Sequence, residues 1–123
     1  MGITARAGST EARYGPIGEV AWDSGNSGDK THEVALKRPN AWSLYDTLAN
    51  VWEWVNDWYD PTYYQNSPPQ DPFGPASGKE HILRGGSWYV GPGLIRLSNR
   101  YGQNPAYRNY NVGFRCGGVV FAP

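Results

Sequence analysis

The side chains best suited to contacting a ligand gather in one stretch of the sequence, residues 89–111. Tyrosines there are interleaved with arginines and asparagines, and tyrosine with asparagine, serine and glycine is typical of adaptable antibody binding surfaces. We expect a ligand- or protein-binding surface formed by Trp88, Tyr89, Arg96, Asn99, Arg100, Tyr101, Tyr107, Arg108 and Tyr110. The alternative is that the tyrosines pack on a sheet while the arginines pair with carboxylates.

Two acidic features could hold a cation. Glu53 stands between Trp52 and Trp54, and a carboxylate buried beside such rings must pair, bind a metal or carry a proton. The loop 23–29 is rich in oxygen ligands, which calcium prefers. Its spacing is not that of an EF-hand, and a solvated turn is the alternative reading of this loop.

Residues for nucleophilic catalysis are sparse. His32 and His81 are the only histidines and have no nearby acidic cluster, which makes a poor metal-site signal. No histidine adjoins Ser87 or Ser98 in sequence, so no nucleophile–base pair is visible. Cys116 is the single cysteine, which excludes an intramolecular disulfide. Its place in a strand pattern predicts a buried, inert thiol.

The composition narrows the range of partners. Eleven Lys and Arg residues balance eleven Asp and Glu residues in a chain of 123, so no strong field would steer nucleic acid to the protein. No apolar run is long enough to span a bilayer, and residues 1–10 lack the pattern of a signal peptide. We therefore expect no nucleic-acid or membrane partner and, by default, a cytoplasmic location.

Short strands and turns must position these side chains, because frequent glycine and proline favour irregular backbone over long helices. Apolar patterns predict strands at 20–22, 32–36, 51–58, 80–88, 94–100, 112–116 and 119–121. A helix tail is predicted at Ala5–Gly8, and a helix at Ala41–Asn50 with Asn40 as its N-cap. Prolines make the stretch 60–79 an irregular excursion.

Two of these strands frame the binding stretch. Ile82–Trp88 and Val112–Cys116 flank residues 89–111 on either side, and we expect them to be partners. Trp52, Trp54 and Trp58 share one parity, so a regular strand would place them on one face.

Six short motifs follow one another along the chain: Ala5-Arg-Ala-Gly8, Thr31-His-Glu-Val34, Pro39-Asn-Ala-Trp-Ser-Leu-Tyr-Asp46, Asn50-Val-Trp-Glu-Trp54, Leu83-Arg-Gly-Gly-Ser-Trp88 and Asn111-Val-Gly-Phe-Arg115. Over nearly its whole length the chain resembles the formylglycine-generating enzyme family, also called sulfatase-modifying factors. The resemblance implies an α+β fold, a variant of the C-type lectin-like fold with a small antiparallel sheet, one or two short helices and much irregular loop. It also implies a single minimal domain over residues 1–123, truncated at its N-terminus, which we expect to self-associate.

The resemblance has different implications for the two metals of the family, copper and calcium. Its enzymes hold copper with two cysteines that follow the Gly-Gly-Ser-aromatic motif, and here Val90 stands about where the first would be. We therefore expect neither copper nor formylglycine-generating activity, since soft thiolates select Cu(I). The family's structural calcium implies a site at Asn26, Asn50, Val51 and Glu53. The usual glycine before Asn50 is Ala49 here, and a positive φ at that position would be less accessible to alanine than to glycine. In the alternative, backbone amides or an arginine such as Arg84 satisfy the Glu53 carboxylate.

Three functions of different classes follow from the resemblance. The first, which we favour, is a non-catalytic binding module acting through residues 89–111, including the possibility of a variable protein of a diversity-generating retroelement. The second is an enzyme with other chemistry, like that of the related sulfoxide synthases. The third is a structural or assembly unit, since exposed aromatic surface favours symmetric oligomers.

Overall fold

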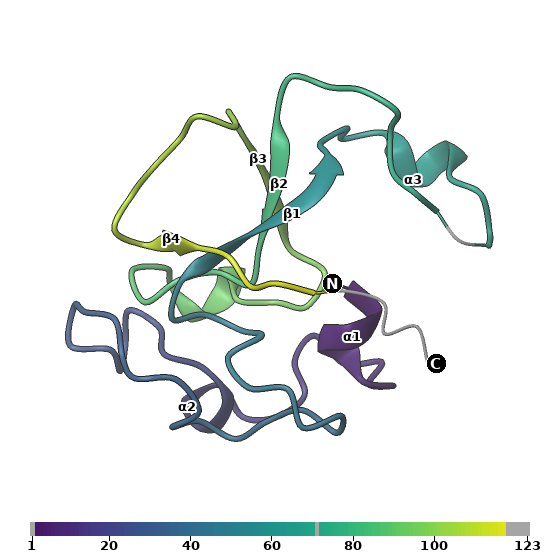
Figure 1. Cartoon of the computed structure of the whole chain (residues 1–123). Coiled ribbons are helices and arrows are strands. Elements are labelled where there is room, and N and C mark those ends of the chain that lie inside the picture. Colours follow the sequence, from purple (N-terminus) through teal and green to yellow (C-terminus); the bar gives the residue numbers. More distant parts are fainter. Residues whose placement is uncertain (1, 71, 118–123) are drawn as a thin grey trace, which may run out of the picture.

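The longest strand, β1 (Trp52–Trp58), lies near the middle of a four-stranded sheet with the order β3-β2-β1-β4 (Figure 1). The computed structural model of the protein describes residues 2–70 and 72–117. β2 (His81–Arg84) is antiparallel to β1 and to β3 (Arg100–Gln103), whereas β4 (Val112–Gly113) runs parallel to β1. The expected partners, the strand before residue 89 and the strand after residue 111, are therefore separated by β1.

The register of the sheet decides which side chains share a face. Glu53 is paired with Arg84, which in turn is paired with Arg100. One position along, the next residues of the three strands form the row Trp54, Leu83 and Tyr101. Because neighbouring strand residues point to opposite faces, these two rows lie on opposite sides of the sheet. An irregularity between Val55 and Trp58 interrupts the alternation at the end of β1.

The helices are all short. They are α1 (Gly2–Arg6), α2 (Ile17–Val20), α3 (Tyr63–Asn66) and one turn of 3-10 helix, η1 (Pro92–Leu94). Among the described residues, none reaches the length and hydropathy that crossing a membrane requires. Short helices, a small sheet and extensive loops confirm the predicted α+β class, with a mixed sheet in place of a wholly antiparallel one.

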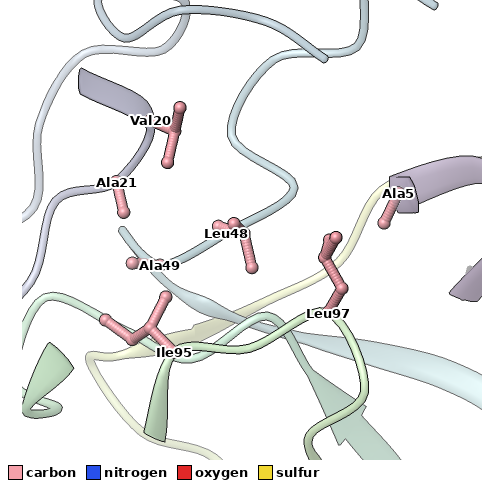
Figure 2. Close-up of a cluster of buried hydrophobic side chains, with 7 residues drawn as sticks. All are labelled: Ala5, Val20, Ala21, Leu48, Ala49, Ile95 and Leu97. Atoms are coloured by element: carbon pink, nitrogen blue, oxygen red, sulfur yellow. The ribbon is translucent and has the colours of Figure 1, made fainter. Parts of the chain in front are cut away.

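The main hydrophobic cluster joins loops that are far apart in the chain. Its seven buried residues are Ala5, Val20, Ala21, Leu48, Ala49, Ile95 and Leu97. Figure 2 shows Leu48 in the middle of this group, between Val20 on one side and Ile95 and Leu97 on the other. Tyr14, Ile17 and Val90 pack against the cluster from its margin. The loops are therefore held by burial of apolar side chains rather than by regular backbone pairing.

The predicted helix over residues 41–50 is wrong. Ser43, Asp46 and Ala49 have φ values of 60°, 53° and 61°, a left-handed conformation that a right-handed helix cannot contain. Asn40 does cap backbone, because its side-chain oxygen accepts hydrogen bonds from the amides of Trp42 and Leu44, both at 3.0 Å. The cap stabilises a turn in place of a helix.

Three of the predicted strands are also wrong. Residues 20–22 contain the end of α2, and residues 32–36 form a turn in which Ala35 has a φ of 63°. Over 94–100 the burial alternates as predicted, with Ile95 and Leu97 buried, yet the strand begins only at Arg100. Asn99 instead donates to the Leu94 carbonyl at 2.7 Å and closes a turn. The strand predicted at 119–121 lies outside the described residues.

Candidate functional site

A pair of glycines positions the start of the predicted binding surface. Gly85 and Gly86 follow β2 with φ values of 91° and 88°, which only glycine adopts at little cost. A Cβ at Gly86 would lie 3.0 Å from a side-chain carbon of Ile95, so the chain also passes too close to the core for a side chain. The glycine turn therefore directs the chain out of the sheet toward Trp88.

The backbone of Trp88 is fixed from two sides. Its amide donates to the Asn50 carbonyl at 2.9 Å, and its carbonyl accepts a hydrogen bond from the Ser27 hydroxyl at 3.0 Å. The preceding residue, Ser87, is fully buried. Trp88 thus holds a defined position relative to the loops that carry Asn50 and Ser27.

Trp88 forms the floor of an aromatic cluster. Its side chain is only 9 % exposed, and its ring lies 5.5 Å from that of Tyr89 and 5.7 Å from that of Tyr110. Tyr89 and Tyr110 are 63 % and 70 % exposed. The buried Trp88 ring holds the cluster in place, and the two exposed tyrosine rings that contact it are accessible from outside. Such an arrangement suits contact with a ligand or protein. These three residues are the part of the predicted site that the structure brings together.

The remaining members of the predicted site are more dispersed. Tyr101, on β3, is 56 % exposed and lies 6.3 Å from the Trp52 ring. Arg96 and Arg108 are exposed, and Arg96 donates to the Gly93 carbonyl at 2.9 Å. Asn99 closes the turn described above, and Tyr107 accepts a hydrogen bond from Asn109.

Arg100 lies apart from this group. Its guanidinium carbon is 4.4 Å from the ring centre of Tyr64 and 5.2 Å from that of Tyr59, and one nitrogen donates to the Pro61 carbonyl at 3.3 Å. The register places Arg100 on the sheet face opposite Tyr101. The sequence did not predict this separation, because the expected strand ended at Arg100, where β3 begins.

Glu53 is buried, as its position between tryptophans indicated, and its partner is Arg115. The Arg115 Nε donates to one carboxylate oxygen of Glu53 at 2.7 Å, and Nη2 donates to the other. The same guanidinium donates to the carbonyls of Tyr45 and Asp46 at 3.1 and 2.9 Å. The hydrogen bond with Glu53 raises the pKa of Arg115 above its usual range. An arginine was one alternative considered for Glu53, and the example named there, Arg84, instead contacts Leu97, Asn99 and Tyr64.

The residues expected to bind calcium are occupied by contacts within the protein. The Asn50 amide exchanges two hydrogen bonds with the backbone of His32, both at 3.0 Å. Asn26 accepts from the Asp23 amide at 2.8 Å and donates to the Ala21 carbonyl at 3.0 Å. With both Glu53 oxygens engaged by Arg115, this donor set does not fit calcium without rearrangement, and a role for Val51 stays a prediction.

Ala49, which replaces the family's usual glycine, has a left-handed φ of 61°. The loop before Asn50 therefore keeps the glycine-like conformation, at some cost in strain. The described residues hold no group of three or more His, Cys, Asp or Glu side chains placed to bind a metal.

Both histidines stack on tryptophan rings, and the cysteine is exposed. His32 stacks on Trp22 with ring centres 3.7 Å apart, and His81 stacks on Trp58 at 3.9 Å. Each has a ring nitrogen near a backbone carbonyl, that of Ser27 at 2.7 Å and that of Asp57 at 3.3 Å. Cys116 is exposed, so the prediction of a buried thiol is wrong. β4 ends at Gly113, before the cysteine can enter the sheet.

Known proteins resemble this chain in sequence and in fold. Residues 3–118 match the sulfatase-modifying factor enzyme 1-like domain. The formylglycine-generating enzyme of Streptomyces coelicolor is 43 % identical over 89 residues, which is 70 % of this chain and 28 % of that enzyme. The chain therefore spans less than a third of this relative's length.

Two solved structures share the fold. Treponema denticola variable protein 1 superimposes with a TM-score of 0.85 and 38 % identity, over 92 % of this chain and 42 % of that protein. PvdO from Pseudomonas aeruginosa gives a TM-score of 0.81 and 28 % identity, over 92 % of this chain and 47 % of that protein. The likeness to both covers nearly all of the present chain and less than half of each neighbour.

Proposed function

This chain belongs to the family of sulfatase-modifying factor enzyme 1-like domains, and from that membership we propose that it is a non-catalytic member that binds a ligand or protein through residues 89–111. The observation that carries the proposal is the Trp88 cluster. A buried indole with a doubly anchored backbone presents two exposed tyrosines, Tyr89 and Tyr110. Rigid aromatic anchors of this kind supply most of the affinity at protein interfaces.

The proposal assigns no formylglycine-generating chemistry to the chain. Val90, which stands where the family's first copper cysteine would be, packs against the hydrophobic cluster. Cys116 is the single cysteine of the sequence. A thiolate pair for copper is therefore missing from the chain itself, and the position of its first member faces the core.

A second candidate is favoured by the likeness to Treponema denticola variable protein 1, which is 38 % identical over 92 % of this chain. In this reading the chain is a variable protein of a diversity-generating retroelement, and residues 89–111 differ from copy to copy. Sequencing of several close copies from related genomes tests it. Substitutions concentrated in the exposed residues of 89–111, with Trp88 and Gly85-Gly86 constant, are expected, whereas identical segments would oppose it.

Binding is tested on peptide and glycan arrays probed with the labelled protein. The double variant Tyr89→Ala/Tyr110→Ala is expected to lose the wild-type signals, with affinity falling by about thirtyfold, the loss expected for removing a hot-spot side chain of about 2 kcal/mol. Tyr45→Ala is the matched control, since Tyr45 is also exposed but lies outside the 89–111 stretch. Equal loss in the control, or no wild-type signal on either array, would contradict the proposal.

A further inference from the structure

A cavity of about 620 Å³ lies on the face of the sheet that carries Arg84 and Arg100. Its walls come from the ends of β1, β2 and β3 and from the excursion that contains α3. In Figure 1 this excursion and the connection between β3 and β4 extend in opposite directions from the sheet. The cavity is within the size range of small-molecule sites, and it is separate from the Trp88 cluster, none of whose members lines it.

Two arginines give the cavity its charge. Arg84 donates to the Tyr64 hydroxyl at 3.0 Å and makes longer contacts, of 3.4 and 3.5 Å, with the carbonyls of Asn99 and Leu97. Arg100 donates to the Pro61 carbonyl and lies over the Tyr64 ring. Within the described part of the chain, the ion pairs are Arg38–Glu19 and Arg115–Glu53, so neither cavity arginine is paired with a carboxylate.

Both guanidiniums line the cavity and keep N–H donors that make no hydrogen bond within the described residues. A guanidinium carries five N–H donors in a planar fork that matches a carboxylate, sulfonate or phosphate. Arg6 also lines the cavity, with one nitrogen near the carbonyls of Ser9 and Glu11. Asp57 is the acidic residue of the lining, so positive charge prevails there.

Aromatic rings form the other walls. Trp58 is stacked on His81, which fixes its plane, and Tyr63 accepts a hydrogen bond from the Gly74 amide at 3.1 Å. Tyr63 and Tyr64 meet edge to face with ring centres 6.1 Å apart. Phe73, at the margin of the cavity, is almost wholly exposed. Aromatic walls favour a planar or aromatic group of a ligand, and the arginines favour a negatively charged group on the same ligand.

We propose that this cavity binds a small organic anion, an aromatic compound whose carboxylate, sulfonate or phosphate group is held by Arg84 and Arg100. The site goes beyond the proposed function, because none of its lining residues belongs to the Trp88 cluster that carries that proposal. It also gives Arg100 a role apart from that cluster. In the competing explanation, the two arginines only hold the excursion in place through Tyr64 and Pro61.

Isothermal titration calorimetry with probes that share one ring system distinguishes these explanations. The probes are naphthalenesulfonate, naphthyl phosphate and naphthoate, with the uncharged naphthalenemethanol as the reference. At least one anion is expected to bind wild-type protein about tenfold or more tighter than the alcohol, the gain expected from a charged hydrogen bond. The preferred anion identifies the acidic group that the site takes.

Substitutions locate the binding. Arg84→Gln and Arg100→Gln are each expected to weaken the preferred anion about tenfold, with little change for the alcohol. Asp57→Asn removes the opposing charge and is expected to tighten the anion up to about fivefold. Arg38→Gln is the matched control, because Arg38 lies outside the cavity and is paired with Glu19.

Three results would overturn the proposal. They are equal affinity for the anions and the alcohol, unchanged anion affinity in both arginine variants, and equal weakening by Arg38→Gln. If Arg84→Gln fails to fold, Arg100→Gln and Asp57→Asn still give opposite expected changes in anion affinity. Variants that only lose stability, with anion affinity unchanged in the folded protein, would support the competing explanation.

Discussion

At the scale of single residues, Arg115 has the clearest structural role. It neutralises the buried carboxylate of Glu53 with a two-point contact and satisfies the carbonyls of Tyr45 and Asp46. The sequence predicted that Glu53 needed a partner, because it lies between two tryptophans. It could not identify that partner, since the parallel pairing that aligns Glu53 with Gly113 joins segments about half the chain apart.

Arg115→Met should therefore destabilise the protein. Removing one partner of a buried ion pair typically costs about 3–5 kcal/mol. Because the Arg115 side chain is 41 % exposed, we expect a smaller loss of about 2–3 kcal/mol in the free energy of unfolding, measured in urea. The double variant Glu53→Gln/Arg115→Met should recover part of this loss. A single variant as stable as wild type would show that Glu53 has another partner.

Calcium provides the second prediction at this scale. If the ion binds at Asn26, Asn50, Val51 and Glu53, it must displace the Arg115 contact, and removing it must lower the melting temperature. With Arg115 already on Glu53, we expect excess chelator to shift the melting temperature by less than about one degree. A larger fall, reversed by added calcium and absent from Glu53→Gln, would establish the calcium site.

Ala35 is an example of backbone strain in the loops. It is exposed to solvent with a φ of 63°, a conformation that costs a residue with a Cβ about 1–2 kcal/mol. Ala35→Gly should raise the free energy of unfolding by up to about 1 kcal/mol, after the added entropy of the unfolded chain is subtracted. Ala76→Gly, at an exposed alanine without a positive φ, is the control and should destabilise slightly. A stabilising control would point to another cause.

At the scale of elements, the sequence predicted the strands that pair in the sheet better than the loops that pack beneath it. β1 and β2 fall within the predicted ranges because their apolar residues are flanked by clear turn residues. The loop 41–50 was mistaken for a helix because its apolar spacing is helical, while its conformation depends on packing of Leu48 and Ala49 in a distant cluster. In such segments, tertiary contacts override the intrinsic preference for a helix.

The excursion between β1 and β2 should be dispensable for folding. The Tyr59 amide donates to the Glu80 carbonyl at 2.7 Å, so its two ends already meet. No described residue between Pro61 and Lys79 is buried. Replacing residues 62–78 with a short Gly-Ser turn should cost less than about 2 kcal/mol of stability in urea and should abolish anion binding in the cavity. Complete unfolding would show that the excursion is part of the core.

At the scale of the whole molecule, the order of six motifs was enough to predict the family and its α+β class. The division of residues 89–111 between two faces of the sheet was not predicted, because the expected strand ended at Arg100, where β3 begins. Catalytic residues were not expected from the sequence. Trp88, Tyr89 and Tyr110 were all expected on the binding surface, but their contact with one another is known only from the structure.

Self-association remains a prediction at this scale. Many large apolar side chains are exposed, among them Val34, Leu36, Trp42, Phe73 and Phe114, and such surface favours symmetric oligomers. Light scattering under reducing conditions is expected to give a mass that is a multiple of the single chain. Reducing agent excludes dimers joined through the exposed Cys116. A monodisperse monomer over a wide concentration range would contradict the prediction.

The loop-to-loop core has a consequence for how the chain acquires its structure during synthesis. Ala5 and Val20 are buried against Ile95 and Leu97, and Arg13 donates a hydrogen bond to Ile95, 82 positions later. Residues 5–20 are therefore synthesised well before residues 95–97, their partners in the core. Because so many contacts are non-local, folding should be slow. Apolar side chains of the early segment, such as Val20, are exposed to aggregation during that interval.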